Sequence, residues 1–267
     1  MTLEEMCYTK TNRTNQQQST ITITRLPNTM NALDNSNTQP RARPAIVAIE
    51  GNIGAGKSTI LEHLRTAFAE KGIRAVFMPE PVDIWSTITD EKGETILSKY
   101  YADAKKYAFP FQMMAYTTRL SILRRTIQEN PGCDVIVCER SLEADHQIFA
   151  KMLFDDQMIE HLQYSVYKWL YDDTAKEYAT DGIVYLMAEP ARCLERIRRR
   201  QRDGESNIPL EYLEKCRKYY DDWLLKEYAN PEQVMKLDVS TDVVYDGTDE
   251  VAKRWIQQIL DFVNTQL

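Results

Sequence analysis

Short apolar segments recur along the chain from residue 45 onward, and longer stretches with apolar residues at helical spacing separate them. Such segments predict strands that are buried on both faces, where neither face has to meet water. Five segments fit this description: AIVAIE (45–50), AVFMPE (75–80), DVIVCER (134–140), IVYLMAEP (183–190) and VMKLDV (234–239).

The intervening stretches predict helices at about 58–72, 95–130, 143–179, 190–202, 209–228 and 248–266. Strands that alternate with helices are typical of a parallel sheet covered on both faces. We therefore predict an α/β fold with a five-stranded parallel sheet and helices on both faces. The helix over 143–179 carries six large apolar residues, most of which we expect to contact the sheet: Phe149, Leu153, Met158, Leu162, Val166 and Trp169.

Residues 1–44 differ from the rest of the chain, because Asn, Gln and Thr dominate there and large apolar residues are sparse. Such a segment cannot bury enough apolar surface to offset the entropy lost on ordering. We predict a disordered tail over 1–44 and one folded domain over 45–267. A mitochondrial targeting segment is the alternative, since the tail is basic, although Glu4 and Glu5 stand where presequences avoid acids.

The net charge of −7 argues against a nucleic-acid backbone as partner, because that contact needs clustered positive charge. The five cysteines are scattered and never spaced as C-x-x-C, so neither a disulfide framework nor a zinc site is expected. No apolar run approaches the roughly 18 residues of a membrane span. These features predict a protein of the reduced cytoplasm that contacts neither nucleic acid nor membrane.

The loop after the first strand fits the phosphate-binding pattern G-x-x-x-x-G-K-S, and a predicted helix follows it. Its glycines permit positive φ angles and let backbone N–H groups approach phosphate oxygens at the helix N-terminus. We expect Lys57 to contact the β- and γ-phosphates and Ser58 to bind Mg²⁺. The nucleotide-binding residues expected here are Gly51, Asn52, Ile53, Gly54, Ala55, Gly56, Lys57, Ser58 and Thr59.

That motif is common to nucleoside triphosphatases and kinases, so other motifs have to decide between them. The chain over roughly 45–265 resembles the deoxynucleoside kinases of the deoxycytidine, deoxyguanosine and insect multisubstrate type. Six segments carry the resemblance: GNIGAGKS (51–58), PEPVDIW (79–85), KKYAFPFQ (105–112), CERS (138–141), RIRRRQRDGES (196–206) and IPLEYLEK (208–215). It implies a P-loop kinase architecture with an arginine-rich lid, and transfer of a phosphoryl group from ATP, with Mg²⁺, to the 5′-hydroxyl of a deoxynucleoside.

The resemblance assigns the chemistry to residues at strand ends. Glu80, in the E-P-V motif, takes the place of the base that accepts the proton of the 5′-hydroxyl. Arg140, with Lys57, would stabilise charge on the transferred phosphoryl group, because an arginine fork suits charge spread over several oxygens. Glu139 would lie near Mg²⁺ or the 5′-hydroxyl. Without the resemblance, Glu80 fits a surface glutamate equally well.

The basic run between 196 and 202 corresponds in this resemblance to a mobile lid over the donor phosphates. Arg196, Arg200 and Arg202 take the positions of lid arginines that contact the donor. Asp242 belongs to the same donor site, and Glu205 corresponds to a lid glutamate that contacts the sugar 3′-hydroxyl. Composition alone indicates a solvated helix face or a nucleic-acid patch.

The acceptor pocket is predicted from the same resemblance. Tyr101 stands eleven residues before Gln112, which is the family's spacing of a 3′-hydroxyl tyrosine and a base-reading glutamine. Gln112 both donates and accepts, which suits a base edge, and Trp85 and Phe111 would supply apolar walls. The segment before Tyr101 is longer than in close relatives, so the neighbouring Tyr100 is an alternative.

Arg119 and Asp145 match positions where relatives that favour deoxycytidine or deoxypurines have an arginine and an aspartate. Thymidine-accepting relatives have smaller or apolar residues there. A buried Arg–Asp pair is costly unless it is well hydrogen-bonded, so its presence suggests base recognition. We therefore expect deoxyadenosine, deoxyguanosine or deoxycytidine as the substrate, rather than thymidine, in nucleotide salvage, and the resemblance implies a homodimer.

Two other functions remain as alternatives, a nucleoside monophosphate kinase and a non-catalytic kinase-like subunit of a larger complex. The first would need a cationic pocket for the acceptor's phosphate, where this chain has Glu80 and Glu205. The second is expected to have lost catalytic residues such as Lys57, Ser58 or Arg140, and all of them are present.

Overall fold

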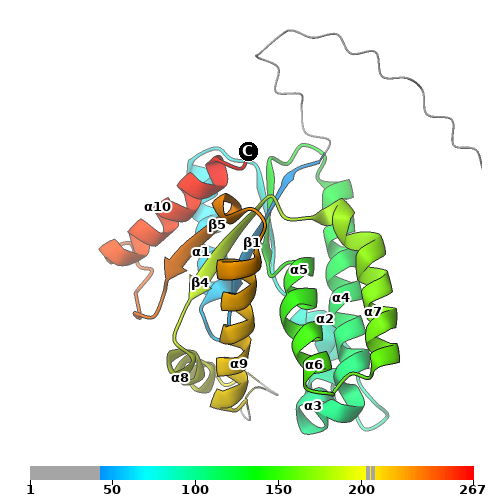
Figure 1. Ribbon diagram of the computed structural model, residues 1–267. Coiled ribbons are helices and arrows are strands. Elements are labelled where there is room, and N and C mark those ends of the chain that lie inside the picture. Colours follow the sequence, from blue (N-terminus) through cyan, green and yellow to red (C-terminus); the bar gives the residue numbers. More distant parts are fainter. Residues whose placement is uncertain (1–42, 203–204, 206–207) are drawn as a thin grey trace, which may run out of the picture. The chain divides into compact units, whose positions relative to one another are not determined.

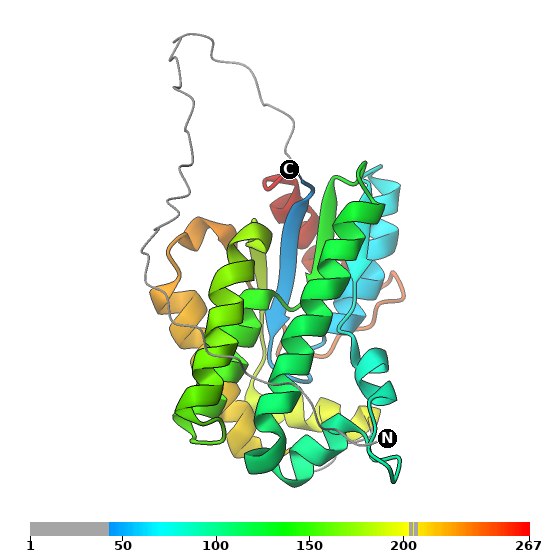
Figure 2. The same ribbon diagram turned by 90° about the vertical axis from the view of Figure 1, so that its right-hand side faces the viewer.

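All five predicted strands form, and they pair in parallel in the order β2-β3-β1-β4-β5. The computed structural model describes residues 43–202, 205 and 208–267 (Figure 1; Figure 2). The predicted five-stranded α/β fold is confirmed. The strands are β1 (Ala45–Gly51), β2 (Ala75–Met78), β3 (Val135–Glu139), β4 (Gly182–Met187) and β5 (Val234–Asp238).

Helices connect the strands and cover both faces of the sheet (Figure 1). Those between β1 and β4 are α1 (Lys57–Glu70), α2 (Val82–Thr87), α3 (Ile96–Ala102), α4 (Ala104–Glu129), α5 (Leu142–Ala144), the π-helix η1 (Asp145–Ala150), α6 (Lys151–Asp155), α7 (His161–Thr174) and η2 (Ala175–Tyr178). After β4 come α8 (Pro190–Arg200), α9 (Leu210–Asp221), the π-helix η3 (Asp222–Glu227), η4 (Pro231–Gln233) and α10 (Glu250–Asn264).

The core has two sides because successive strand residues point to opposite faces of the sheet. Val47 and Ile49 of β1 belong to the cluster that includes residues of α1 and α10. Ile46, the residue before Val47 in the strand, points to the opposite face and belongs to the cluster formed with residues of α4 and α7. The continuous burial of β1 explains why its sequence shows an unbroken apolar run rather than an alternating one.

The long helix predicted over 143–179 is interrupted, and its outer half does not pack as expected. Gln157 adopts a positive φ of 59° between α6 and α7, which ends the first part. In α7, Leu162, Val166 and Trp169 are 75%, 50% and 70% exposed, so the prediction of sheet contact is wrong for these three. The helix packs inward through tyrosines such as Tyr167, and its apolar stripe of Leu162, Val166 and Trp169 stays exposed.

The predicted tail lies outside the described residues, apart from its last two positions. Arg43 donates from Nη1 to Oδ2 of Asp181 at 2.7 Å and from Nη2 to the carbonyl of Ala179 at 2.8 Å. The entry into β1 is therefore fixed from Arg43 onward. Within the described residues, no helix combines the length and the apolar character that crossing a membrane requires.

The topology places a crevice at the carboxyl ends of β1 and β3. These strands are neighbours, but the chain leaves β1 into α1 on one face and leaves β3 into α5 on the other. Loops that diverge from adjacent parallel strands open the crevice in which sheets of this kind bind ligands. The phosphate loop follows β1 and the E-R-S segment follows β3, so both motifs meet there.

Candidate active site

The phosphate loop is packed closely against the rest of the site. Gly54 has a φ of +81°, and a Cβ at this position would lie 2.5 Å from the carbonyl oxygen of Cys193 in α8. Only glycine meets both conditions without strain. Lys57 is buried, and its Nζ donates to the carbonyls of Gly51 and Asn52 at 3.2 and 2.9 Å. Burial, with the charge of Arg140, lowers the pKa of Lys57 to about 8.

The two residues expected at the metal lie in contact. Ser58 at the start of α1 donates from Oγ to Oε1 of Glu139 at the end of β3, at 2.9 Å. A hydroxyl and a carboxylate are hard oxygen ligands of the kind that Mg²⁺ takes together with phosphate oxygens and water. The donor set therefore fits Mg²⁺ at this point of the site.

Glu80, two residues past β2, is held by two arginines. Arg119 Nη2 and Arg140 Nε each donate to its Oε1 at 3.0 Å. Burial by itself raises the pKa of Glu80, but the charges of Arg140, Arg119 and Lys57 outweigh it and lower the pKa to about 2. The carboxylate is thus charged at neutral pH, as an acceptor of a proton has to be.

Arg140 has an unusual backbone for a side chain of its size, with a φ of 68°. Its guanidinium carbon lies 4.7 Å from the centre of the Phe149 ring, and its Nη1 donates to the carbonyl of Gly51 at 3.2 Å. A non-glycine residue in the left-handed region costs free energy, and such positions persist where surrounding contacts hold them. Arg140 is held in this way from several sides.

At the far end of the site, Arg119 joins Glu80 to Asp145. Its Nη1 donates to Asp145 Oδ2 at 3.0 Å, and the arginine is fully buried. Gln112 lies about two turns before Arg119 in α4 and donates from Nε2 to the carbonyl of Asp145 at 3.1 Å. Burial raises the pKa of Asp145 to about 6, although Arg119 opposes the shift.

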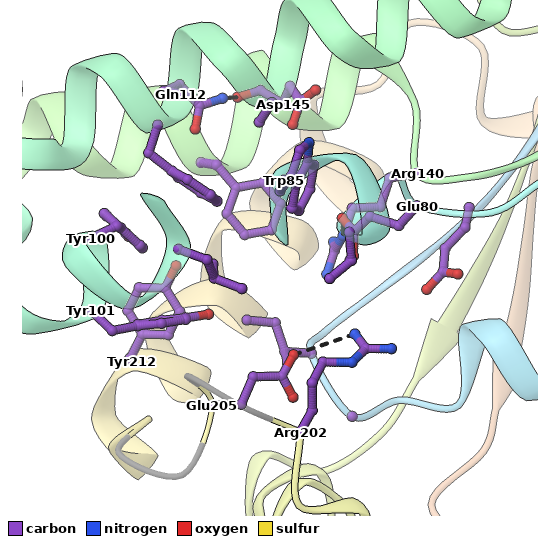
Figure 3. A pocket seen from close by; sticks show the side chains of 18 of the residues that line it. Glu80, Trp85, Tyr100, Tyr101, Gln112, Arg140, Asp145, Arg202, Glu205 and Tyr212 are labelled. Atoms are coloured by element: carbon purple, nitrogen blue, oxygen red, sulfur yellow. Dashed lines mark hydrogen bonds and ion pairs between the residues drawn. The ribbon is translucent and has the colours of Figure 1, made fainter. Parts of the chain in front are cut away.

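Aromatic rings line the space between these two ends. The Trp85 ring meets Phe111 edge-on, with 5.6 Å between ring centres, and its Nε1 donates to Thr118 Oγ1 at 3.0 Å. Tyr100 stacks flat on Phe111 at 4.7 Å. Tyr101 and Glu205 face the same space in Figure 3, so of the two tyrosines Tyr101 better fits the predicted sugar contact.

Two arginines, Arg200 at the end of α8 and Arg202 just after it, meet the predicted lid glutamate. Glu205 is 6% exposed and accepts from Arg200 Nε at 2.9 Å. Arg202 Nη1 lies 3.5 Å from the other carboxylate oxygen of Glu205. In Figure 3 this group lies across the cavity from Gln112 and Asp145. Arg200, Arg202 and Glu205 therefore line the same cavity as Gln112 and Asp145.

A second cavity, with about 800 Å³ of open space, lies on the other side of the phosphate loop. Arg196 Nε and Nη2 donate to Asp242 Oδ1 at 2.9 and 2.8 Å, and Nη2 also donates to the carbonyl of Val239 at 2.9 Å. These bonds hold the segment after β5 against α8. The predicted donor-site residues that line this cavity are Gly54, Ala55, Gly56, Thr59, Arg196, Arg200 and Asp242.

The first cavity, with about 730 Å³ of open space, collects most of the remaining predicted residues. They are Ile53, Gly54, Lys57, Glu80, Trp85, Tyr101, Phe111, Gln112, Glu139, Arg140, Asp145, Arg200, Arg202 and Glu205. Arg119 is not among the lining residues, but it donates hydrogen bonds to Asp145 and Glu80, which are. Sequence reasoning missed Val82, Leu97, Ala115, Phe149, Leu153 and Tyr212. Val82 lies within the quoted PEPVDIW segment and Tyr212 within IPLEYLEK, and these two segments were the available signals.

Comparison with known proteins agrees with this geometry. The family model for deoxynucleoside kinases matches residues 47–264. The chain belongs to the deoxynucleoside kinase family. The sequence-based assignment to that family, and to an enzyme of that type, is confirmed.

Relatives of this deoxynucleoside kinase include deoxycytidine kinases and a deoxyguanosine kinase. The deoxycytidine kinase of Bos taurus is 31% identical over 245 residues, covering 82% of this chain and 91% of the relative. Deoxycytidine kinase 1 of Xenopus laevis is 29% identical over 248 residues, covering 82% of this chain and 90% of the relative. The mitochondrial deoxyguanosine kinase of Xenopus laevis is 32% identical, covering 68% of this chain and 73% of the relative. The family implies a small-molecule acceptor and a nucleotide as phosphate donor.

Proposed function

We propose that this kinase transfers the γ-phosphoryl group of ATP, with Mg²⁺, to the 5′-hydroxyl of deoxyadenosine, deoxyguanosine or deoxycytidine, as a step of nucleotide salvage. One observation carries the proposal. A single cavity is lined by Lys57 of the phosphate loop, by the Glu80–Arg140 pair and by the polar end at Gln112 and Asp145. The pair lies between a phosphate-binding loop and a polar recess with aromatic walls, which suits a nucleoside with its 5′ end toward the donor.

The reaction follows from the charges at this point. Both arginine bonds to Glu80 end on Oε1, and within the described residues no hydrogen bond reaches Oε2. That oxygen is the one we assign to the proton of the attacking 5′-hydroxyl. Arg140 and Lys57 bring positive charge to the phosphoryl oxygens on which negative charge spreads. Mg²⁺, held by Ser58 with Glu139, would neutralise charge on the donor phosphates when bound.

The preference for bases with an amino group is proposed from the buried Arg119–Asp145 pair. A desolvated aspartate that stays charged accepts a hydrogen bond well, and the exocyclic amino groups of adenine, guanine and cytosine are donors. Thymine offers a carbonyl and a methyl group instead, and neither suits a carboxylate.

The test is a panel of four deoxynucleosides with ATP and Mg²⁺, in which the 5′-monophosphate is measured. Lys57→Ala serves as the inactive control, and a parallel series uses deoxynucleoside monophosphates as acceptors. We expect phosphorylation of the amino-bearing deoxynucleosides and little of thymidine. Turnover of monophosphates alone would replace the proposal with the monophosphate kinase alternative, and no turnover at all would favour the non-catalytic subunit.

We also propose that the kinase is a homodimer, joined through α7. The support is the stripe of Leu162, Val166 and Trp169, which are four and three residues apart on one helix face and mostly exposed. A two-fold dimer joins the same surface patch of both subunits, and an exposed apolar helix face can form such a patch. Sedimentation velocity tests it: Trp169→Lys should sediment as a monomer, while Lys168→Gln, on the same helix, should match the parent. A monomeric parent would end the proposal.

For location we propose the cytoplasm, with mitochondria as the alternative if residues 1–44 are a targeting segment. We propose no nucleic-acid or membrane partner, on the strength of the net charge of −7. A fusion of residues 1–44 to a fluorescent reporter distinguishes the two compartments. Diffuse fluorescence supports the cytoplasm, and mitochondrial fluorescence supports the alternative.

A further inference from the structure

A buried glutamate that the reaction does not require lies directly before the phosphate loop. Glu50 in β1 is 0% exposed. Its Oε1 accepts from both the backbone N and the Oγ of Ser141, each at 2.7 Å. Burying a carboxylate is costly unless hydrogen bonds or charges compensate. An apolar side chain would cost less free energy to bury at this core position, so stability alone does not explain the glutamate.

The second oxygen of Glu50 leads to the catalytic arginine. Tyr220, fully buried in α9, donates from its hydroxyl to Glu50 Oε2 at 3.1 Å. The same hydroxyl accepts a short hydrogen bond from Arg140 Nη1. The result is a chain from guanidinium to phenol to the carboxyl group of Glu50. Hydrogen bonds to charged groups such as this guanidinium are the stronger ones, and both bonds here are buried.

The chain acts on a residue whose position is otherwise unfavourable. Arg140 has a positive φ, and its next neighbour in sequence, Ser141, is the other partner of Glu50. One carboxylate thus holds the backbone after Arg140 through Ser141 and the guanidinium through Tyr220. Both ends of the arginine are fixed from a single point.

Tyr220 also connects this point to the helix that follows the lid. Its helix, α9, begins directly after the lid segment, and Leu213 in the same helix accepts from Asn52 Nδ2 of the phosphate loop at 2.8 Å. One helix therefore contacts both the phosphate loop and the catalytic arginine from behind.

We propose that Glu50 and Tyr220 are positioning residues that aim the Arg140 guanidinium at the transferred phosphoryl group. Neither lines the acceptor cavity or the donor cavity, so each acts through Arg140. The inference rests on the proposed role of Arg140 in phosphoryl transfer. Its loss should therefore appear in kcat rather than in the binding of either substrate.

Tyr220→Phe is the direct test, because it removes one oxygen and keeps the ring. Tyr185→Phe is a matched control: Tyr185 stacks on Tyr220 with 5.5 Å between ring centres, and its hydroxyl donates to Asp221 at 2.7 Å instead. We expect Tyr220→Phe to lower kcat about tenfold or more, as expected for a lost hydrogen bond to a charged group. The KM values for nucleoside and ATP should stay within about twofold, and Tyr185→Phe should keep the parent kcat.

A double-mutant cycle separates positioning from packing. In an Arg140→Met background, adding Tyr220→Phe should cause no further loss of kcat, because the guanidinium that Tyr220 positions is absent. An equal loss in both backgrounds, or an equal loss in Tyr185→Phe, would overturn the proposal. If Tyr220→Phe does not fold, Glu50→Gln replaces it, since an amide offers one acceptor oxygen to the three donors that converge there. Glu50→Gln with the parent kcat would likewise overturn it.

The cycle also distinguishes this proposal from the one on which it rests. If Arg140→Met itself keeps normal activity, the assigned role of Arg140 is wrong. If Arg140→Met is inactive while folded Tyr220→Phe is normal, only the positioning role fails.

Discussion

Arg119 and Glu80, which are 39 residues apart in sequence, form an ion pair with 3.0 Å between Nη2 and Oε1. The same guanidinium binds Asp145 through Nη1. The residue proposed to read the base therefore contacts the residue proposed to accept the proton. A change at one end of the acceptor site is expected to reach the other through Arg119, and the predictions below take this coupling into account.

The first prediction concerns the general base. Glu80→Gln should lower kcat by about 10²–10⁴-fold, because the amide cannot accept the proton of the 5′-hydroxyl. The amide oxygen can still accept from Arg119 and Arg140, so nucleoside binding should survive. Steady-state kinetics and a calorimetric Kd measure the two effects separately. Glu62→Gln, exposed on α1, is the control, and a near-normal kcat would remove Glu80 from this role.

The second prediction is a pH dependence that belongs to Asp145 rather than to Glu80. The arginines keep the pKa of Glu80 at about 2, so it stays charged in mildly acidic solution. Burial raises the pKa of Asp145 from 3.8 to about 6, so this carboxylate is protonated first as the pH falls. A neutral Asp145 accepts more weakly from a base amino group. Between pH 7 and 5 we expect kcat/KM for an amino-bearing nucleoside to fall about tenfold, because the charged fraction of a carboxylate with a pKa of about 6 falls by that factor.

The control for this titration is Asp145→Asn, which carries no charge at any pH in the range. Its kcat/KM starts lower at pH 7 and should not show the same decline toward pH 5. A decline of equal size in the variant would assign the titration to another group, such as the γ-phosphate of the donor.

The third prediction distinguishes the two adjacent tyrosines. Tyr101→Phe and Glu205→Gln should each reduce the preference for a deoxynucleoside over its 2′,3′-dideoxy analogue. We expect the ratio of the two kcat/KM values to fall about tenfold, as expected for one hydrogen bond to a substrate hydroxyl. Tyr100→Phe should leave the ratio unchanged, because that ring stacks on Phe111. The opposite result for the two tyrosines would exchange their roles.

Much of the candidate acceptor cavity was predictable, because a few motifs fix the register of whole elements. Gln112 and Arg119 lie seven residues apart, so a single continuous α4 brings both to one buried face. Contacts between elements were not predictable in this way. Nothing in local spacing indicates that Arg119 reaches Glu80, because that distance depends on how α4 packs beside β2.

The fold was predicted correctly from the sequence, and the error in the packing of α7 has a similar cause. Five apolar runs were sufficient to predict five parallel strands, since burial on both faces leaves a strong signal. The apolar stripe of α7 gave an equally strong signal and was assigned to the core. Periodicity shows that a helix has an apolar face, but not what covers it. Tyr167 and neighbouring tyrosines pack inward in its place, which their polar hydroxyls made less obvious in the sequence.

The last prediction is a change of base preference. Arg119→Met with Asp145→Ala removes both charges and opens space beside the pyrimidine C5 position. Removing one member alone leaves the other charge buried without its main partner, and we expect that to damage every activity. In the double variant no such charge remains. We therefore expect the ratio of kcat/KM for thymidine to that for deoxycytidine to rise about tenfold or more, equivalent to about 1.4 kcal/mol of discrimination.

The ion pair between Arg119 and Glu80 determines how that experiment should be judged. Losing Arg119 removes one of the two arginines that are hydrogen-bonded to Glu80, and Arg140 Nε remains at 3.0 Å from its Oε1. The Glu80 carboxylate should then be held less firmly in position, so kcat is expected to fall for every nucleoside. Absolute rates therefore cannot decide the matter, whereas the ranking of thymidine, deoxycytidine, deoxyadenosine and deoxyguanosine can. A double variant that keeps the parent's ranking, or a parent that already prefers thymidine, would show that this pair does not read the base.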